Sequence, residues 1–89
     1  MKAIYKYPIL VQDYQTITMP KGATILSVQN QNGYLQMWAI VDIDCQEIET
    51  RIFRMIGTGN PFIDTDMTMY IDTVQHDGYV WHIFEETIK

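Results

Sequence analysis

The 89 residues are enough for one domain, residues 1–89, with a core of modest size. The net charge of −5 and six scattered Lys and Arg residues argue against nucleic-acid binding, which requires clustered cations. One cysteine excludes an internal disulfide, and no apolar run is long enough for a signal peptide or a membrane span. We therefore expect a soluble cytoplasmic protein that has no membrane partner.

The first part of the chain has the residues of short β-strands. A strand is predicted over residues 3–7, and Pro8 ends it because proline is confined to strand ends and edges. A second strand with β-branched residues is predicted over residues 15–19. The turn at Pro20-Lys-Gly22 then reverses the chain, with proline early and glycine late in the turn.

A β-hairpin is the clearest local prediction. Residues 24–31 and 34–42 have strand composition and flank Asn32-Gly33, which suits a type I′ turn because both residues tolerate positive φ. The two strands are therefore expected to pair antiparallel. In the first strand, strict alternation places one set of side chains together on one face: Leu26, Val28 and Asn30.

The second part of the chain repeats this organisation. Strands are predicted over residues 47–56, 69–75 and 79–85, and Asp77-Gly78 is a second hairpin turn signal. Residues 57–68 form the one long loop. With about seven short strands and no predicted helix, the chain is expected to be all-β and mainly antiparallel, as a small β-sandwich or a partly open β-barrel.

Two predicted strands are apolar on both faces. Residues 35–41 place Trp38 and Ile40 opposite an apolar face, and residues 79–84 show the same pattern. A sheet with one solvated face alternates apolar and polar residues, so we expect a second subunit to cover these strands and predict a homo-oligomer. The alternative is that both are central strands of a tight barrel with some exposed aromatic residues.

The candidate site lies between Arg51 and Pro61, where a strand with two arginines enters a glycine-containing loop. Arg51 and Arg54 are three residues apart, so they point to opposite faces of an ideal strand. A guanidinium near aromatic rings can stack on a base or bind a phosphate. The alternative is that the arginines form surface ion pairs with Glu47 or Glu49.

The loop segment Gly57-Thr58-Gly59-Asn60 is the second part of this candidate site. Its glycines allow close backbone approach, and a run of N–H groups there could bind an anion. It lacks the lysine and the helix that follow the glycines of a phosphate-binding loop. A glycine-marked exit from a strand is the competing interpretation.

Three further residues complete the predicted ligand contacts. Trp38 and Trp81 offer rings on which a base could stack, and His82 lies beside Trp81. A histidine in an aromatic strand is also commonly a hydrogen-bonded structural residue, and the spacing of the two histidines matches no standard zinc pattern. We therefore predict an anionic small-molecule ligand and no metal or cofactor.

No residue set indicates catalysis. Cys45 lies between acidic and amide residues, which does not favour a thiolate, and Ser27 lacks the context of a nucleophile. Asp64 and Asp66 form a loop pair that could bind a cation weakly, without the rest of a calcium loop. A binding protein is therefore expected rather than an enzyme.

Several sequence blocks carry a resemblance that covers nearly the whole chain. They are Ile4-Tyr-Lys-Tyr-Pro8, Met19-Pro-Lys-Gly-Ala23, Ile25-Leu-Ser-Val-Gln29, Trp38-Ala-Ile-Val-Asp42, Gly57-Thr-Gly59, Tyr70-Ile-Asp-Thr-Val-Gln75 and Trp81-His-Ile-Phe-Glu85. In this order they resemble the DUF7352 family of short phage and prophage proteins of unknown function, although Asp72 stands where the family has glycine. The resemblance implies a phage or bacterial genome and no particular activity.

Three functions remain open from the sequence. The first is a small phage-type binding protein, with an anti-defence role in which it sequesters a nucleotide-derived signal in the host cytoplasm. The second is a protein–protein inhibitor whose acidic surface docks on a host protein. The third is a structural or assembly component of a virion.

Overall fold

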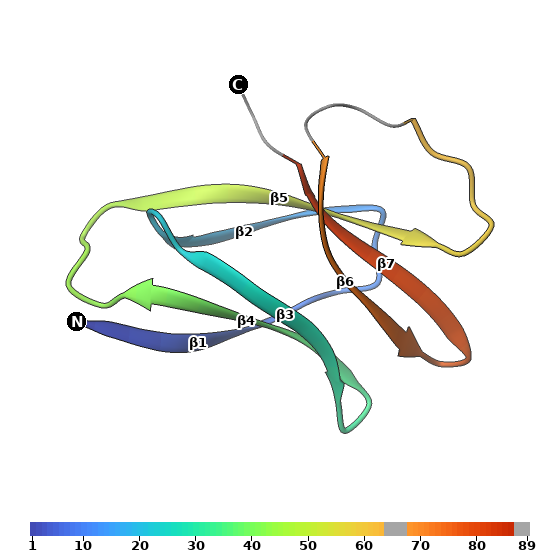
Figure 1. Cartoon of the computed structure of the whole chain (residues 1–89), viewed down its shortest axis with the longest axis horizontal. Helices are drawn as coiled ribbons and strands as arrows, with labels where there is room; N and C mark the ends of the chain where they lie inside the picture. The colour runs from blue at the N-terminus through green and yellow to red at the C-terminus, as the bar shows by residue number, and fades with distance from the viewer. Residues whose placement is uncertain (64–67, 87–89) are drawn as a thin grey trace.

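The computed structural model describes residues 1–63 and 68–86, and these residues form seven β-strands without a helix (Figure 1). The expected strands are confirmed, with ends that shift by at most one residue. Among the described residues there is also no helix that could cross a membrane. The strands are β1 (Lys2–Pro8), β2 (Tyr14–Pro20), β3 (Thr24–Gln31), β4 (Tyr34–Asp42), β5 (Ile48–Gly57), β6 (Thr68–His76) and β7 (Tyr79–Glu86).

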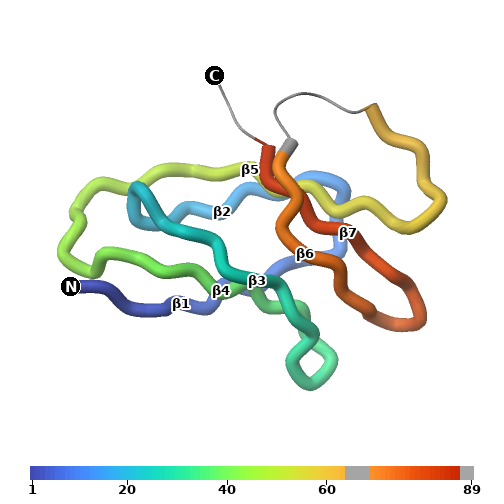
Figure 2. The backbone as a smooth tube through the Cα atoms, viewed as in Figure 1, coloured from blue at the N-terminus to red at the C-terminus, as the bar shows by residue number. Residues whose placement is uncertain are grey.

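The strands form two antiparallel sheets that pack on each other as a sandwich. One sheet has three strands in the order β1-β4-β3, and the other has four in the order β2-β5-β7-β6. The predicted all-β class is confirmed, and the sandwich form is observed rather than a closed barrel. Figure 2 shows how the chain passes from one sheet to the other through the turn between β2 and β3.

Both predicted hairpin turns are confirmed by their backbone angles. Asn32 and Gly33 have φ values of 55° and 91°, and Asp77 and Gly78 have values of 51° and 82°. Positive φ at both central residues is the requirement of a type I′ turn, whose twist matches that of the flanking strands. These two turns fix β3 against β4 and β6 against β7.

The core lies between the two sheets and follows the alternation of their strands. Along β4, Leu35, Met37, Ala39 and Val41 point inward and are all buried, a choice between two apolar faces that the sequence left open. The opposing sheet contributes Phe53 and Met55 from β5 and Ile83 from β7. The largest fully buried side chains are Phe53, Met19, Met37, Ile83, Val28 and Val41.

The predicted alternation of β3 is wrong at Leu26. A β-bulge between Ile25 and Ser27 inserts Leu26 as an extra residue, so Ile25 pairs with Ala39 and Val28 pairs with Met37. Leu26 is 44% exposed, whereas Val28 is fully buried. The two residues therefore do not share a face, because a bulge reverses the alternation that follows it.

The two sheets meet along β3 and β6, which lie side by side (Figure 1). The Val28 N–H donates to the Asp72 carboxylate at 3.1 Å, and the Asn30 side-chain amide donates to the Gln75 carbonyl at 3.0 Å. Strand β6 is bulged here as well, between Tyr70 and Asp72. Asp72 therefore joins the edge strands of the two sheets.

Candidate functional site

The two arginines of β5 point to opposite faces of the four-stranded sheet. Arg51 lies on the inner face with Phe53 and Met55, and Arg54 lies on the outer face, which is the face turned away from the three-stranded sheet. Strand β5 has no register shift that would bring them together. The prediction from strand geometry is confirmed, so each arginine has its own surroundings.

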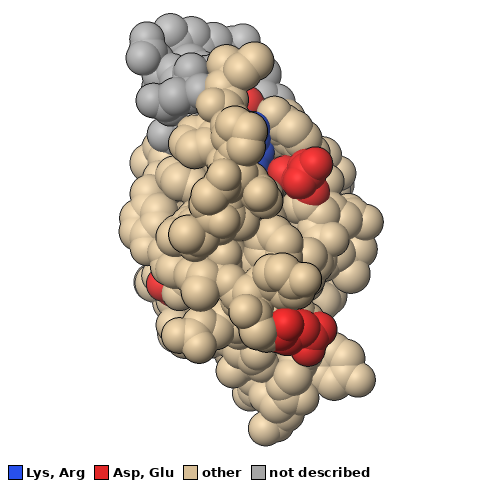
Figure 3. Space-filling view, turned by 90° about the vertical axis from the view of Figure 1, so that its right-hand side faces the viewer, with Lys and Arg blue, Asp and Glu red and all other residues tan. Residues whose placement is uncertain are grey.

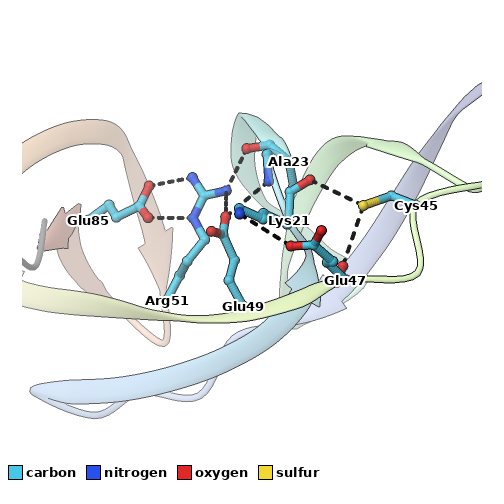
Figure 4. A network of polar contacts seen from close by, with 8 residues as sticks. Lys21, Ala23, Cys45, Glu47, Glu49, Arg51 and Glu85 are labelled. Atoms are coloured by element: carbon cyan, nitrogen blue, oxygen red, sulfur yellow. Dashed lines mark hydrogen bonds and ion pairs between the residues drawn. The ribbon is translucent and has the colours of Figure 1, made fainter.

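Arg51 is held by a network of carboxylates and a carbonyl at one end of the core (Figure 4). Its Nε and Nη2 donate to the two carboxylate oxygens of Glu85, with Nη2 and Oε1 2.8 Å apart. Its Nη1 also lies 3.5 Å from Oε1 of Glu49. The hydrogen bonds that Arg51 donates to Glu85 are the main cause that raises the pKa of Arg51 above its usual value. The attraction of Glu85 and Glu49 also raises it, and burial opposes the shift. Arg51 therefore joins β5, β7 and the β2–β3 turn, through the Ala23 carbonyl, and its charge is already balanced.

Arg54 has very different surroundings. The residue is only 8% exposed, and its guanidinium lies over the Tyr14 ring at 4.7 Å and over the Phe62 ring at 5.8 Å. Nη1 donates to the Ile63 carbonyl at 3.3 Å, and Nε has no hydrogen-bond partner. Among the described residues no carboxylate lies within ion-pair distance of Arg54, so within that part of the chain its guanidinium lies between aromatic rings and is not paired with an acid.

A small hollow adjoins Arg54. It has a volume of about 140 Å³, and Arg54, Asn60 and Phe62 line it together with the Asp13–Tyr14 end of the β1–β2 connection. Arg54 comes from β5, Tyr14 from the start of β2 and Phe62 from the loop after β5. The antiparallel register brings Tyr14 directly opposite Arg54. The hollow is therefore an anion-sized space beside an arginine.

The predicted loop segment contributes to this hollow mainly through Asn60. The Thr58 N–H donates to the Val80 carbonyl at 3.2 Å, and the Asn60 N–H donates to the Gly57 carbonyl at 3.0 Å, with Gly59 at φ 87°. These donors close a turn, which matches the strand-exit interpretation. A Cβ at Gly57 would lie 2.7 Å from the Asn60 amide and 3.1 Å from the Trp81 ring, so glycine permits their close approach.

His82 lies on the outer face, two residues along β7 from the position opposite Arg54. Its Nε2 is 2.8 Å from the Thr58 hydroxyl, and its Nδ1 is 3.1 Å from the Thr73 hydroxyl. The Tyr70 hydroxyl continues this chain to Thr73 at 2.7 Å. Both ring nitrogens of His82 are therefore occupied by hydroxyls that link β6, β7 and the loop after β5.

The two tryptophans lie away from Arg54. Trp81 points inward at the end of the core, where its ring packs near Gly57 and 5.8 Å from the Tyr79 ring. Trp38 lies on the outer face of the three-stranded sheet, opposite Lys6. The structure thus brings Arg54, Asn60, Thr58 and His82 to one face and separates them from Arg51, Trp38 and Trp81.

Sequence reasoning missed the aromatic residues that surround Arg54. Phe84 lies opposite Arg54 on β7, with the Phe62 ring 6.3 Å away and the Tyr70 ring 5.7 Å away. Phe62 and Tyr70 therefore cover part of the apolar outer face of β7 from within the chain. The alternation of Tyr14 with Thr16 and Thr18 is visible in the sequence, but its register against Arg54 is not.

Charged side chains are sparse on one side of the molecule. Figure 3 shows the side that carries the β6–β7 hairpin, where separate acidic areas and one small basic area interrupt an otherwise uncharged surface. Within residues 1–63 and 68–86, no three His, Cys, Asp or Glu side chains come together to hold a metal ion. Asp64 and Asp66, the predicted weak cation pair, lie outside the described residues.

The fold defines the chain as a small all-β sandwich domain. Its whole length, residues 1–89, matches the model of a domain of unknown function, DUF7352. The chain therefore belongs to the DUF7352 family, as the sequence blocks indicated. Neither a curated protein nor a solved structure matches it significantly.

Proposed function

We propose that the protein is a non-enzymatic binding protein for an anionic, ring-bearing ligand of the nucleotide type. The ligand's anionic group contacts Arg54 on the outer face of the four-stranded sheet. The observation that supports this most is the 8% exposure of Arg54 together with its lack of a carboxylate partner among the described residues. Arg51, which has the same chemistry, is already paired with Glu85.

The free-energy cost of burying the Arg54 charge favours the binding of an anion beside it. Burying a charged group costs several kcal/mol in a real protein, even after the surroundings relax. A cation over an aromatic ring recovers about 0.5–2 kcal/mol, so Tyr14 and Phe62 together recover at most about 4 kcal/mol. One carbonyl contact at 3.3 Å adds little. An anion bound at Arg54 would offset the remaining free-energy cost of burying its charge.

The size of the hollow limits which part of the ligand it takes. Sites for drug-sized molecules have volumes of about 300–1,000 Å³, whereas the hollow at Arg54 has about 140 Å³. It therefore accepts a single anionic group such as a phosphate. The ring of the ligand then lies outside, on the exposed side chains of Tyr14 and Phe62, which suits base stacking.

The biological setting extends this proposal. In this proposal the protein is phage-encoded and acts in the host cytoplasm, where it sequesters a nucleotide-derived signal in an anti-defence role. Sequestration requires affinity and no catalytic group, in agreement with the absence of a recognisable nucleophile. The protein–protein inhibitor has less support, because the acidic side chains are separated on the side that Figure 3 shows.

The experiment that tests the proposal is calorimetry with thermal unfolding. The probes are inorganic phosphate, nucleoside monophosphates, cyclic nucleotides and ADP-ribose. At least one probe should release heat and raise the unfolding temperature of the wild type, and Arg54→Met should abolish both effects. Without ligand, Arg54→Met should stabilise the fold by about 1–4 kcal/mol, because it replaces a buried charge that has no carboxylate partner in the described part of the chain with an apolar side chain.

The matched control is Lys6→Met, which removes an exposed cation from the other sheet and should leave binding unchanged. The proposal is overturned if none of the probes releases heat on binding. The proposal is also overturned if Arg54→Met destabilises the fold and a double-mutant cycle shows that this effect is coupled to Asp64→Asn or Asp66→Asn. That result would show Arg54 to be a structural partner of the loop carboxylates.

A further inference from the structure

The sandwich has three strand edges that it protects and one that it does not. The β3 and β6 edges contact each other through Asp72 and Asn30. The β1 edge carries Lys2, Lys6 and Pro8, which are residues that prevent strands from adding to an edge. Strand β2 has the sequence YQTITMP, with no charge, and its proline is the last residue. Within residues 1–63 and 68–86, its only neighbour in the sheet is β5.

The open edge of β2 presents a regular set of backbone groups. Lys21 donates its N–H to the Glu47 carbonyl, and the Asp13 carbonyl accepts the Met55 N–H. These bonds show that the odd-numbered residues of β2 bond to β5. Because antiparallel strands alternate in this respect, the N–H and C=O groups of Thr16 and Thr18 point to the open edge.

There is space along this edge. A hollow of about 730 Å³ lies beside the first half of β2, lined by Tyr14, Gln15, Thr16 and Ile17, with Leu10 and Pro8 on its other side. Its lining is mainly apolar. Leu10 is 58% exposed there. The Gln15 side chain exchanges hydrogen bonds of 3.0 and 2.7 Å with the Leu10 backbone, so the β1–β2 connection lies close to the start of this edge. Among the described residues, no hydrogen bond is made to the edge-facing backbone groups of Thr16 and Thr18, so that part of the edge is open.

We propose that two copies of this chain pair through β2 as an antiparallel, two-fold symmetric dimer, with Ile17 opposite Ile17 of the partner subunit. In this register Thr16 lies opposite the partner's Thr18. Both are residues whose backbone groups point to the open edge, so they exchange hydrogen bonds. The two four-stranded sheets join into one continuous sheet across the dimer.

Charge complementarity selects this register. With Ile17 on the two-fold axis, Asp13 lies opposite the partner's Lys21 at each end of the pair. Lys21 contacts Glu47 of its own chain at 3.2 Å, so Asp13 adds a second carboxylate beside this lysine. Shifting the register by two residues in either direction puts Asp13 opposite an uncharged residue, the partner's Met19 or Ala23. Opposite charges across a strand pair are favourable, and like charges are unfavourable. The equivalent pairing through β1, centred on Ile4, would oppose Lys2 to the partner's Lys6 and is disfavoured.

The dimer brings the second subunit to the candidate site. Asp13 and Tyr14 line the hollow at Arg54, and the register places the partner's Lys21 and the partner's Pro20 beside them. Each subunit thus adds a second cation at the rim of the other subunit's Arg54 hollow. The dimer itself does not depend on a ligand, so its test uses the ligand-free protein.

The first test is sedimentation equilibrium of the full chain with charge-swap variants. The wild type should be a dimer, and Asp13→Lys should raise the dimer dissociation constant about tenfold or more, because it opposes lysine to lysine twice. The double variant Asp13→Lys with Lys21→Asp should restore the dimer. Lys2→Asp on β1 and Arg54→Met should dimerise like the wild type.

The second test fixes the register by disulfide cross-linking on a Cys45→Ser background. Ile17→Cys should form a covalent dimer on mild oxidation, because residue 17 faces itself in a non-hydrogen-bonded pair with Cα atoms about 4.5 Å apart. Thr16→Cys alone should not, whereas a mixture of Thr16→Cys and Thr18→Cys chains should form a heterodimer. A monomeric wild type, or a dimer that neither responds to Asp13→Lys nor cross-links at residue 17, overturns the proposal.

Discussion

At the scale of the residue, two arginines three positions apart have opposite roles. Arg51 is surrounded by acceptors, with Glu85, Glu49 and the Ala23 carbonyl around its guanidinium. Arg54 is surrounded by rings. The odd spacing on one strand produces this division, because successive side chains point to opposite faces. The two arginines look alike in the sequence, but Arg51 is a structural residue and Arg54 is a candidate ligand contact.

Removing the partner of Arg51 should destabilise the fold. Both Arg51 and Glu85 have side chains that are 17% exposed, so Glu85→Gln leaves a largely buried guanidinium without its carboxylate. We expect a loss of about 1–3 kcal/mol after allowance for the remaining solvent exposure, measured by urea unfolding. Glu47→Gln removes the exposed Lys21–Glu47 contact instead and should cost less than about 0.5 kcal/mol.

The first residue should give the stability a weak dependence on pH. The Asp44 carboxylate, followed by Asp42, raises the pKa of the Met1 ammonium, and the Asp44 backbone N–H lowers the pKa of Asp42. The Asp42 contribution is present above its unfolded pKa and is lost as the pH falls. The Met1 contribution is present below its unfolded pKa and is lost as the pH rises through the raised value. In an NMR titration, Asp44→Asn should bring the Met1 pKa back toward 8.0; an unchanged value would contradict this contact.

At the scale of the element, the β3 bulge decides which residues form the core. Alternation alone pairs Leu26 with Val28, and the inserted residue at the bulge separates them. We expect Leu26→Ser to change the free energy of unfolding by less than about 1 kcal/mol, since Leu26 is 44% exposed. Val28→Ala should cost about 1–3 kcal/mol because Val28 is fully buried. Chemical denaturation of both variants checks the assignment, and equal costs would argue for unbroken alternation.

At the scale of the whole molecule, two edge strands hold the sheets together. The chain is flat, with extents of 41 × 34 × 15 Å, and its sheets are joined along β3 and β6. Asp72 contributes a carboxylate to the Val28 N–H and lies near the Gln29 amide. Asp72→Ala leaves that N–H without a partner, so we expect a loss of about 1–3 kcal/mol in thermal unfolding. Asp72→Asn retains an acceptor and should cost less; equal losses would show that charge, rather than the hydrogen bond, matters there.

The sequence by itself determined the strands and both hairpin turns. Those features depend on local alternation and on Asn-Gly and Asp-Gly pairs that tolerate positive φ. It also determined that Arg51 and Arg54 diverge. Only the tertiary structure decided the bulges, the β3–β6 junction and the rings around Arg54. Tyr14, Phe62 and Phe84 are distant from one another in sequence, and they converge only because of the register of β2 and β7 against β5. Register depends on the packing of whole faces, which no local pattern encodes.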